Sequence, residues 1–248
     1  IKIFIQYGSI TDEKFWDRAK SFFLLKNVEG KYFTLDEYKT YIETLQKDKN
    51  ETLVYLYAAD AEKQHIYIQS AQERGYDVLL MDSILDAHFI NMLEQKLEKS
   101  KFARVDADVI DKLIEKEDSL ISKLSEEERK NLSEIFENSV EKEKFTVVVE
   151  SLNDTDLPVM IMQNEFMRRF QDMERLSGQN GMYGRFEHYN LVVNDNNEVI
   201  VNLLKEEDAE KKSQMTQQLV DLALLSQNML TGEKLSQFVR RSLDFIAK

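Results

Sequence analysis

Apolar residues in the first half of the chain follow two spacings, which predict strands alternating with helices. Residues 52–58, 77–81 and 101–105 are almost continuously apolar, as strands buried on both faces are. Residues 60–74 and 84–97 repeat apolar residues at helical spacing, with Ile66 and Ala71 directed inward and Gly75 ending the first helix. This order predicts a small three-stranded parallel sheet with helices on both faces.

Helices are also expected ahead of this α/β/α unit. Thr11 is a suitable N-cap for the first, which carries Phe15, Phe22 and Phe23 at helical spacing. A loop around Gly30 should follow over residues 27–34, and a second helix should begin at Asp36. Charge becomes dense over residues 115–128, so we place a domain boundary there and expect domains of residues 1–115 and 116–248.

The second domain has a different pattern, which predicts a mixed α+β fold. Ser125 precedes three glutamates and reads as the cap of a helix. Strands are expected at 145–152, 158–162 and 188–193, with a helix at 164–176 and another after the asparagine-rich break at 194–197. Two strongly apolar helices, 211–230 and 233–246, close the chain on either side of Gly232.

Composition narrows the class of protein. The 248 residues are 42% hydrophobic and 32% charged, typical of a soluble globular chain, and the net charge of −13 argues against a free-standing nucleic-acid binder. The absence of cysteine excludes disulfides and thiolate sites, and no apolar run is long enough for a transmembrane helix, so we expect a cytoplasmic protein and no membrane partner. The apolar start at Ile1 suggests a fragment of a longer chain.

The sequence contains no recognisable catalytic or cofactor motif. The three histidines lack the paired spacing of a metal site, and neither a phosphate-binding glycine loop nor a nucleophile elbow occurs. We therefore expect no catalytic, cofactor-binding or metal residues. The alternative is a small α/β enzyme or nucleotide-binding domain with its site at the carboxyl ends of the parallel strands.

Three helices carry more apolar surface than an ordinary core helix needs. In the 164–176 segment, Phe166, Phe170 and Met173 share one face, while Met167 lies off that face among arginines. Methionine and phenylalanine on more than one face suit an adaptable binding surface, but a plain core helix is the commoner explanation of such a pattern. The two terminal helices could likewise pack on their own domain or pair with a second copy as a four-helix bundle.

Eight short motifs, in order along nearly the whole chain, resemble the ninety-kilodalton heat-shock chaperones, and most closely the bacterial high-temperature protein G type. They are EKFW (13–16), DVLLMD (77–82), LD (85–86), FARV (102–105), DLPV (156–159), DMERL (172–176), DLALLS (221–226) and FVRR (238–241). The first four resemble the end of that family's middle domain, and the rest resemble its C-terminal dimerisation domain.

This resemblance implies a fragment of an ATP-dependent stress-response chaperone that forms a homodimer and binds unfolded or partly folded clients. ATP and magnesium would bind in an N-terminal domain outside this chain, so the fragment itself would be non-catalytic. Client contacts are implied at His88, which stands where the bacterial pattern has tryptophan, at Asn91, and in the 164–176 helix at Phe166, Met167, Phe170 and Met173. The dimer interface is implied at Leu219, Leu222, Leu225, Met229, Phe238 and Leu243.

Overall fold

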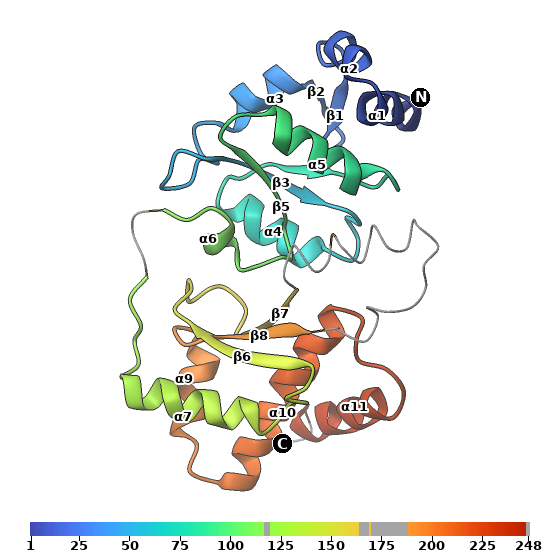
Figure 1. The fold of residues 1–248 in the computed structure, drawn as a ribbon. Coiled ribbons are helices and arrows are strands. Elements are labelled where there is room, and N and C mark those ends of the chain that lie inside the picture. The colour runs from blue at the N-terminus through green and yellow to red at the C-terminus, as the bar shows by residue number, and fades with distance from the viewer. Residues whose placement is uncertain (117–119, 164–168, 170–187, 247–248) are drawn as a thin grey trace. The chain divides into compact units, whose positions relative to one another are not determined.

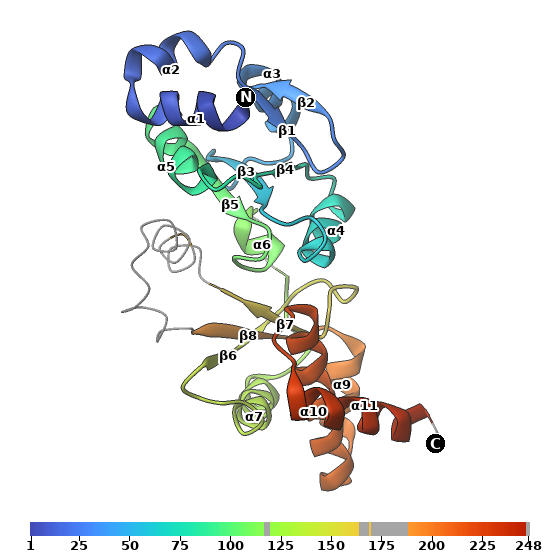
Figure 2. The ribbon, with the colours of Figure 1, turned by 90° about the vertical axis from the view of Figure 1, so that its right-hand side faces the viewer.

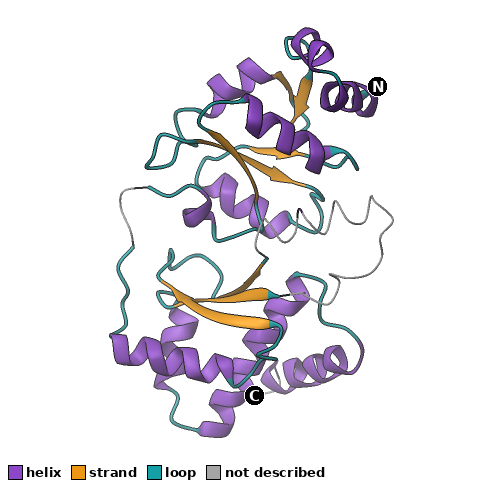
Figure 3. Ribbon diagram, viewed as in Figure 1, coloured by secondary structure: helices purple, strands orange, loops and turns teal. Residues whose placement is uncertain are grey.

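The chain contains two compact units, each with its own three-stranded sheet. The computed structural model describes residues 1–116, 120–163, 169 and 188–246 (Figure 1). The first unit comprises residues 1–116 and Arg169, and the second comprises residues 120–163 and 188–246. Within these ranges each unit contains both helices and strands, so the predicted mixed α and β composition is confirmed (Figure 3).

The first unit is an α/β/α layer preceded by helices and a small hairpin. Its helices are α1 (Lys2–Thr11), α2 (Glu13–Ala19), α3 (Leu35–Ile42), α4 (His65–Glu73), α5 (Asp86–Lys96) and α6 (Ile110–Leu113). Strands β1 (Leu24–Lys26) and β2 (Tyr32–Thr34) form the antiparallel hairpin. The central sheet has the order β4-β3-β5, formed by β3 (Leu53–Ala58), β4 (Val78–Leu80) and β5 (Ser100–Arg104).

Both pairings in this sheet are parallel, with Leu56 opposite Val78 and Leu53 opposite Ser100, as predicted. Strand β3 is buried throughout, and its alternating residues serve two layers. Tyr55 and its odd-numbered neighbours join an aromatic core with α2, α3 and α5. Figures 1 and 2 show α4 on the opposite face of the sheet, which the even-numbered residues of β3 therefore face.

That core is built largely from rings. Phe89 of α5 meets Trp16 at a centroid distance of 6.1 Å and Phe23 at 4.7 Å. Tyr55 and Phe102 stack at 4.6 Å across neighbouring strands. Because aromatic side chains bury the most area per residue, this core fixes α5 firmly on the sheet.

The structure corrects several local predictions in this unit. Thr11 is the last residue of α1, a helix that was not predicted, and its hydroxyl donates to the Tyr7 carbonyl at 2.8 Å. The N-cap of α2 is Asp12, whose carboxylate accepts from the Lys14 N–H at 2.8 Å, so Thr11 was the wrong cap. An aspartate caps a helix as well as a threonine does, and spacing alone did not separate the two neighbours.

The predicted loop at 27–34 contains β2, because Gly30 at φ +85° lets the chain turn back as a hairpin. Helix α4 begins at His65 instead of Asp60, and its buried residues are Tyr67, Ile68 and Ala71, leaving Ile66 only half-buried. The Gln64 side chain causes the late start, because it accepts from the N–H groups of Ala59 and Asp60 and holds residues 61–64 as turns.

The second unit has a mixed sheet with its helices on one face, as Figures 1 and 2 show. Strand β8 (Tyr189–Asn194) lies between β6 (Phe145–Glu150), to which it is parallel, and β7 (Val159–Met162), to which it is antiparallel. The helices are α7 (Glu126–Glu137), α9 (Glu198–Lys205), α10 (Ala209–Ser226) and α11 (Gly232–Ile246). Their shared core is aliphatic apart from Phe136 and Phe145 among its buried members.

The helix predicted after the asparagine-rich break is confirmed as α9, and Asn197 caps it by accepting from the Val199 N–H at 2.9 Å. Helix α10 ends earlier than predicted. Asn228 adopts φ +57°, and the Met229 N–H returns to the Leu224 carbonyl at 2.9 Å, which closes the helix before Gly232. Gly232 instead opens α11. Among the helices that the structure describes, none combines the length and apolar character needed to cross a membrane.

Candidate interaction surfaces

A polar network at the crossing of α10 and α11 sets how the last helix lies on the second unit. Arg241 pairs with the buried carboxylate of Asp221, with an Nη2–Oδ2 distance of 2.5 Å. The same guanidinium donates through Nε to Gln218 Oε1 at 2.8 Å, and Gln218 Nε2 donates to the Ser242 hydroxyl at 2.8 Å. A guanidinium held by two acceptors permits little rotation, so these contacts fix which face α11 presents.

The start of α11 has a second tether at the surface. Lys234 Nζ donates to Glu141 Oε1 at 2.8 Å, and Lys144 pairs with Glu141 Oε2 at 2.8 Å. These two lysine contacts lower the pKa of Glu141 to about 2. The carboxylate therefore stays ionised at any pH near neutrality.

An exposed apolar stripe lies along α10 and α11, and we call it the terminal stripe. Its members are Leu222, Leu225, Val239, Leu243, Phe245 and Ile246. Leu243 is 60% exposed and Ile246 is 81% exposed, values that are high for aliphatic residues on regular helices. Phe245 and Ile246 of the stripe also form part of the lining of a shallow cavity of about 370 Å³, together with Met215 and Leu219. Several exposed apolar side chains on two neighbouring helices are typical of an association site.

The predicted dimer residues divide between this stripe and the core. Leu222, Leu225 and Leu243 belong to the stripe, whereas Leu219 and Phe238 are buried within the unit. Met229 is half-buried against the same core. Val239, Phe245 and Ile246 were outside the predicted set, although Val239, Leu243 and Ile246 follow the i, i+4, i+7 spacing that would have identified them.

In the first unit, α5 presents the predicted client-contact residues on the edge of its polar face. Phe89, Ile90 and Leu93 hold the helix on the sheet, and His88 and Asn91 are half-buried on the other side. Asn91 is engaged by Arg169, whose Nη1 donates to Asn91 Oδ1 at 3.2 Å. The same guanidinium pairs with Glu94, a contact that could not be predicted from the sequence because 75 residues separate the partners.

The remaining predicted client-contact residues, Phe166, Met167, Phe170 and Met173, lie outside the described residues. Their role therefore stays a prediction.

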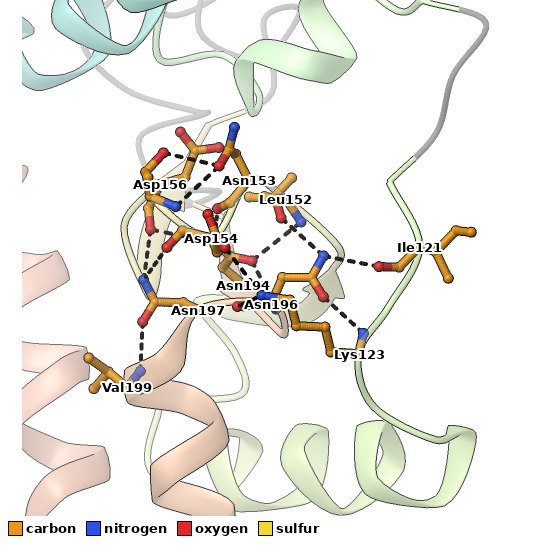
Figure 4. A network of polar contacts seen from close by, with 11 residues as sticks. Ile121, Lys123, Leu152, Asn153, Asp154, Asp156, Asn194, Asn196, Asn197 and Val199 are labelled. Carbon is orange, nitrogen blue, oxygen red and sulfur yellow. Dashed lines mark hydrogen bonds and ion pairs between the residues drawn. The ribbon is translucent and has the colours of Figure 1, made fainter.

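The asparagine-rich loop at 194–197 is a buried polar network (Figure 4). Asn194 Nδ2 donates to the Asn153 carbonyl at 2.8 Å, and Asn196 Nδ2 donates to the carbonyls of Leu152 and Ile121 at 3.1 and 3.2 Å. The Lys123 N–H donates back to Asn196 Oδ1 at 2.9 Å. These amides satisfy main-chain groups of two other segments, which is a structural role.

Asp195 in the same loop is fully buried, and its Oδ2 accepts from Ser122 Oγ at 2.7 Å. Arg129 Nε pairs with the same oxygen at 3.0 Å. The pairing offsets the cost of burying the carboxylate. The loop thereby ties residues 121–123 to the end of β8.

The carboxyl ends of the parallel strands, where the enzyme alternative would place a ligand, carry acidic residues. Asp60, Asp82 and Asp106 each stand two residues beyond a strand. The nearby guanidinium of Arg104 already pairs with Asp106, including an Nη2–Oδ2 contact of 2.8 Å. Lys63 likewise pairs with Asp60 at 3.0 Å and Lys2 pairs with Asp82 at 3.2 Å, so the cations beside these carboxylates are already engaged. Across the described ranges, no group of three or more acidic, histidine or cysteine side chains is placed to hold a metal ion.

Taken together, the described residues define a two-unit α/β protein whose most distinctive surface is an apolar helical stripe suited to association. The sequence matches the family described as Hsp90 protein over residues 3–243, so the chain belongs to that family.

Among its relatives, the chaperone protein HtpG of Bacteroides fragilis is 36% identical over 314 residues, covering 99% of this chain and 46% of the relative. The chaperone protein HtpG of Porphyromonas gingivalis is 36% identical over 310 residues, covering 98% of this chain and 45% of the relative. That of Bacteroides thetaiotaomicron is 35% identical over 314 residues. The chain thus spans about half the length of these relatives.

Proposed function

We propose that this chain is the dimerising and client-binding part of an ATP-dependent chaperone, with the nucleotide site elsewhere in the longer protein. Family membership and the name shared by its relatives support a chaperone role. Their greater length leaves room for an ATP-binding domain. We propose residues 1–115 as the end of the middle domain, 116–248 as the dimerisation domain, and the cytoplasm as its location.

The terminal stripe is the single observation that carries the dimer proposal. Leu222 and Leu225 on α10 and Leu243 on α11 expose 40–60% of their surface on helices that the Asp221–Arg241 pair holds rigidly. Covering apolar surface gains roughly 25 cal/mol per Å², so a second copy that covers the stripe is favoured. An isologous pairing of α10 and α11 makes a four-helix bundle.

Changing both Leu222 and Leu225 to glutamate should convert the dimer to a monomer, because charges buried without partners are costly. Light scattering at tens of micromolar protein measures the mass. The matched control is Ile84→Glu in the first unit, where the exposed fraction is 64% and the dimer should persist. A strictly monomeric wild-type chain, or an unchanged mass for the double variant, would contradict the proposal.

The client-binding proposal joins His88 and Asn91 of α5 to Phe166, Met167, Phe170 and Met173. Polar and apolar residues together can engage a partly unfolded chain, the first by hydrogen bonds and the second by apolar contact. Serine substitutions at Phe166 and Phe170 should weaken binding of a partly unfolded test protein, measured by fluorescence anisotropy, while the dimer mass stays constant. Unchanged affinity would assign these residues to the core.

Nucleotide binding distinguishes this proposal from the enzyme alternative. Calorimetry of the isolated chain with ATP, ADP and a dinucleotide should detect no binding, because the cations at the strand ends already pair with Asp60, Asp82 and Asp106. Saturable heat with any of the three would favour the alternative.

A further inference from the structure

Three oxygen acceptors converge on one guanidinium at the edge of the first unit, and we call them the arginine notch. They are the Glu94 carboxylate and the Asn91 side-chain oxygen on α5, and the Phe102 carbonyl on β5. Arg169 Nη1 meets Glu94 Oε2 at 2.7 Å, and Nη2 meets Glu94 Oε1 at 3.2 Å and the Phe102 oxygen at 2.5 Å. The fork of the guanidinium thus spans the carboxylate, a geometry that an ammonium cannot reproduce.

Two of the three acceptors, the Glu94 carboxylate and the Phe102 carbonyl, are also held by contacts other than those with Arg169. Glu94 Oε1 also accepts from the Phe102 N–H at 2.7 Å, which fixes the carboxylate against the strand. Phe102 is buried and stacked on Tyr55, and the helix carrying Asn91 and Glu94 is anchored by buried Phe89 and Leu93. The notch is therefore a preformed site on rigid elements, the condition under which a ligand loses least entropy on binding.

We propose that the arginine notch binds an arginine side chain of an unfolded client, and that Arg169 fills the notch in the free chain. This inference rests on the proposed client-binding function and deepens it by naming the chemistry recognised. Asn91 belongs both to the notch and to the proposed client-contact set, so a client lying on α5 reaches these acceptors. The net charge of −13 attracts basic segments towards the chain.

The occupied notch also weakens client binding until Arg169 leaves. Because Arg169 is part of the same chain, it competes at a high effective concentration. The apparent affinity for a client arginine falls in proportion to the fraction of molecules with an open notch. The arrangement favours clients whose further contacts, beyond one arginine, compensate for displacing Arg169.

The test compares two short disordered peptides that are identical except for one central arginine, which is replaced by the uncharged isostere citrulline in the second. Binding to the full 248-residue chain is followed by fluorescence anisotropy. Arg169→Ala should raise the affinity for the arginine peptide about tenfold and leave that for the citrulline peptide unchanged, since charge-assisted bidentate bonds are of this strength. Arg168→Ala is the matched control, because it removes the same charge from the adjacent position and should leave the ratio between the peptides as in the wild type.

A second variant, Glu94→Gln in the Arg169→Ala background, tests whether the Glu94 carboxylate is responsible for the preference for arginine. Glutamine keeps an oxygen for the Phe102 N–H, so the fold should persist, as circular dichroism would verify, while the preference for arginine disappears. Equal affinity of both peptides for Arg169→Ala, or an equal gain with Arg168→Ala, would overturn the arginine notch and leave client binding intact. If neither peptide binds any variant, the proposed client-binding function fails together with this inference.

Discussion

Helices α5 and α11 are both amphipathic, yet they use their apolar faces in opposite ways. Helix α5 buries Phe89, Ile90 and Leu93 against the sheet and leaves polar residues at the surface. Helix α11 buries Phe238 alone among its residues and exposes Val239, Leu243 and Ile246. The same periodicity therefore supports a buried core face in one unit and an exposed apolar face in the other.

The difference lies in what each helix packs against. Helix α5 covers a sheet whose aromatic residues meet it directly, whereas α11 is attached chiefly to α10, partly through the polar Asp221–Arg241 pair. Polar contacts orient a helix without covering its apolar face. The following substitutions test this difference between the two helices. Unless stated otherwise, the free energy of unfolding is measured by urea denaturation in the Leu222→Glu, Leu225→Glu background, which should be monomeric.

The largest effect is expected for Phe89→Ala, which should lower the free energy of unfolding by about 3–5 kcal/mol, because it leaves a cavity between Trp16 and Phe23. The counterpart Leu243→Ala on α11 should change it by less than about 0.5 kcal/mol, since the side chain is already exposed. Comparable losses for both would show that α11 covers a core of its own, which contradicts the contrast.

Arg241→Met should cost about 2 kcal/mol by leaving the Asp221 carboxylate buried without its cation. This is less than breaking a fully enclosed pair costs, because Gln217 still donates to Asp221 at 2.9 Å. Adding Asp221→Asn should restore most of the loss, and the double-mutant cycle measures the coupling. Additive losses would show that the two side chains do not act as a pair.

The two units should respond alike where their local chemistry is the same. Thr34 and Ser125 each form a capping box, with Glu37 and Glu128 respectively. Alanine at either position should cost about 1 kcal/mol. Hydrogen exchange should show faster opening confined to the first turn of α3 for one variant and of α7 for the other. Spread of the effect across both units would mean that they unfold as one body.

The smallest effect concerns the surface tether of α11. The folded pKa of Glu141, about 2, lies below its ordinary value of 4.5, so its contribution to stability is present above pH 4.5 and is lost as the pH falls towards 2. Glu141→Gln should therefore cost a few tenths of a kcal/mol above pH 4.5, because the side chain is half exposed, and progressively less as the pH falls through about 2. A cost that does not fall over this range would exclude ionisation as its cause.

Long periodic segments were predictable from the sequence, because an element buried against a sheet or core repeats apolar residues at a regular spacing. The three parallel strands, α5 and the terminal helices are of this kind. Helix boundaries that depend on one side chain could not be predicted. Asp12, and not Thr11, caps α2, and the Gln64 side chain makes α4 begin later than expected. Helix α10 ends early because Asn228 adopts a positive φ. Asparagine tolerates this conformation, but its presence in a sequence does not predict it.

The sequence predicts which helices carry the candidate surfaces, but not which face of each helix is exposed. Leu219 and Leu222 are both periodic leucines on α10, yet one is buried and the other exposed, because only the packed unit decides which side of a wide apolar stripe meets its core. The arginine notch left no trace in the sequence, since Glu94 and Arg169 are ordinary charges until the fold brings them together.

The asparagine-rich loop has a consequence for synthesis. Ser122 and Lys123 bond to Asp195 and Asn196, partners 73 residues later in the chain. When the ribosome has just made Ser122, none of those partners exists. Residues 121–123 therefore cannot make these contacts until strand β8 and the loop that follows it have emerged. The first unit meanwhile can complete its own sheet, so the order of translation separates the two folding events.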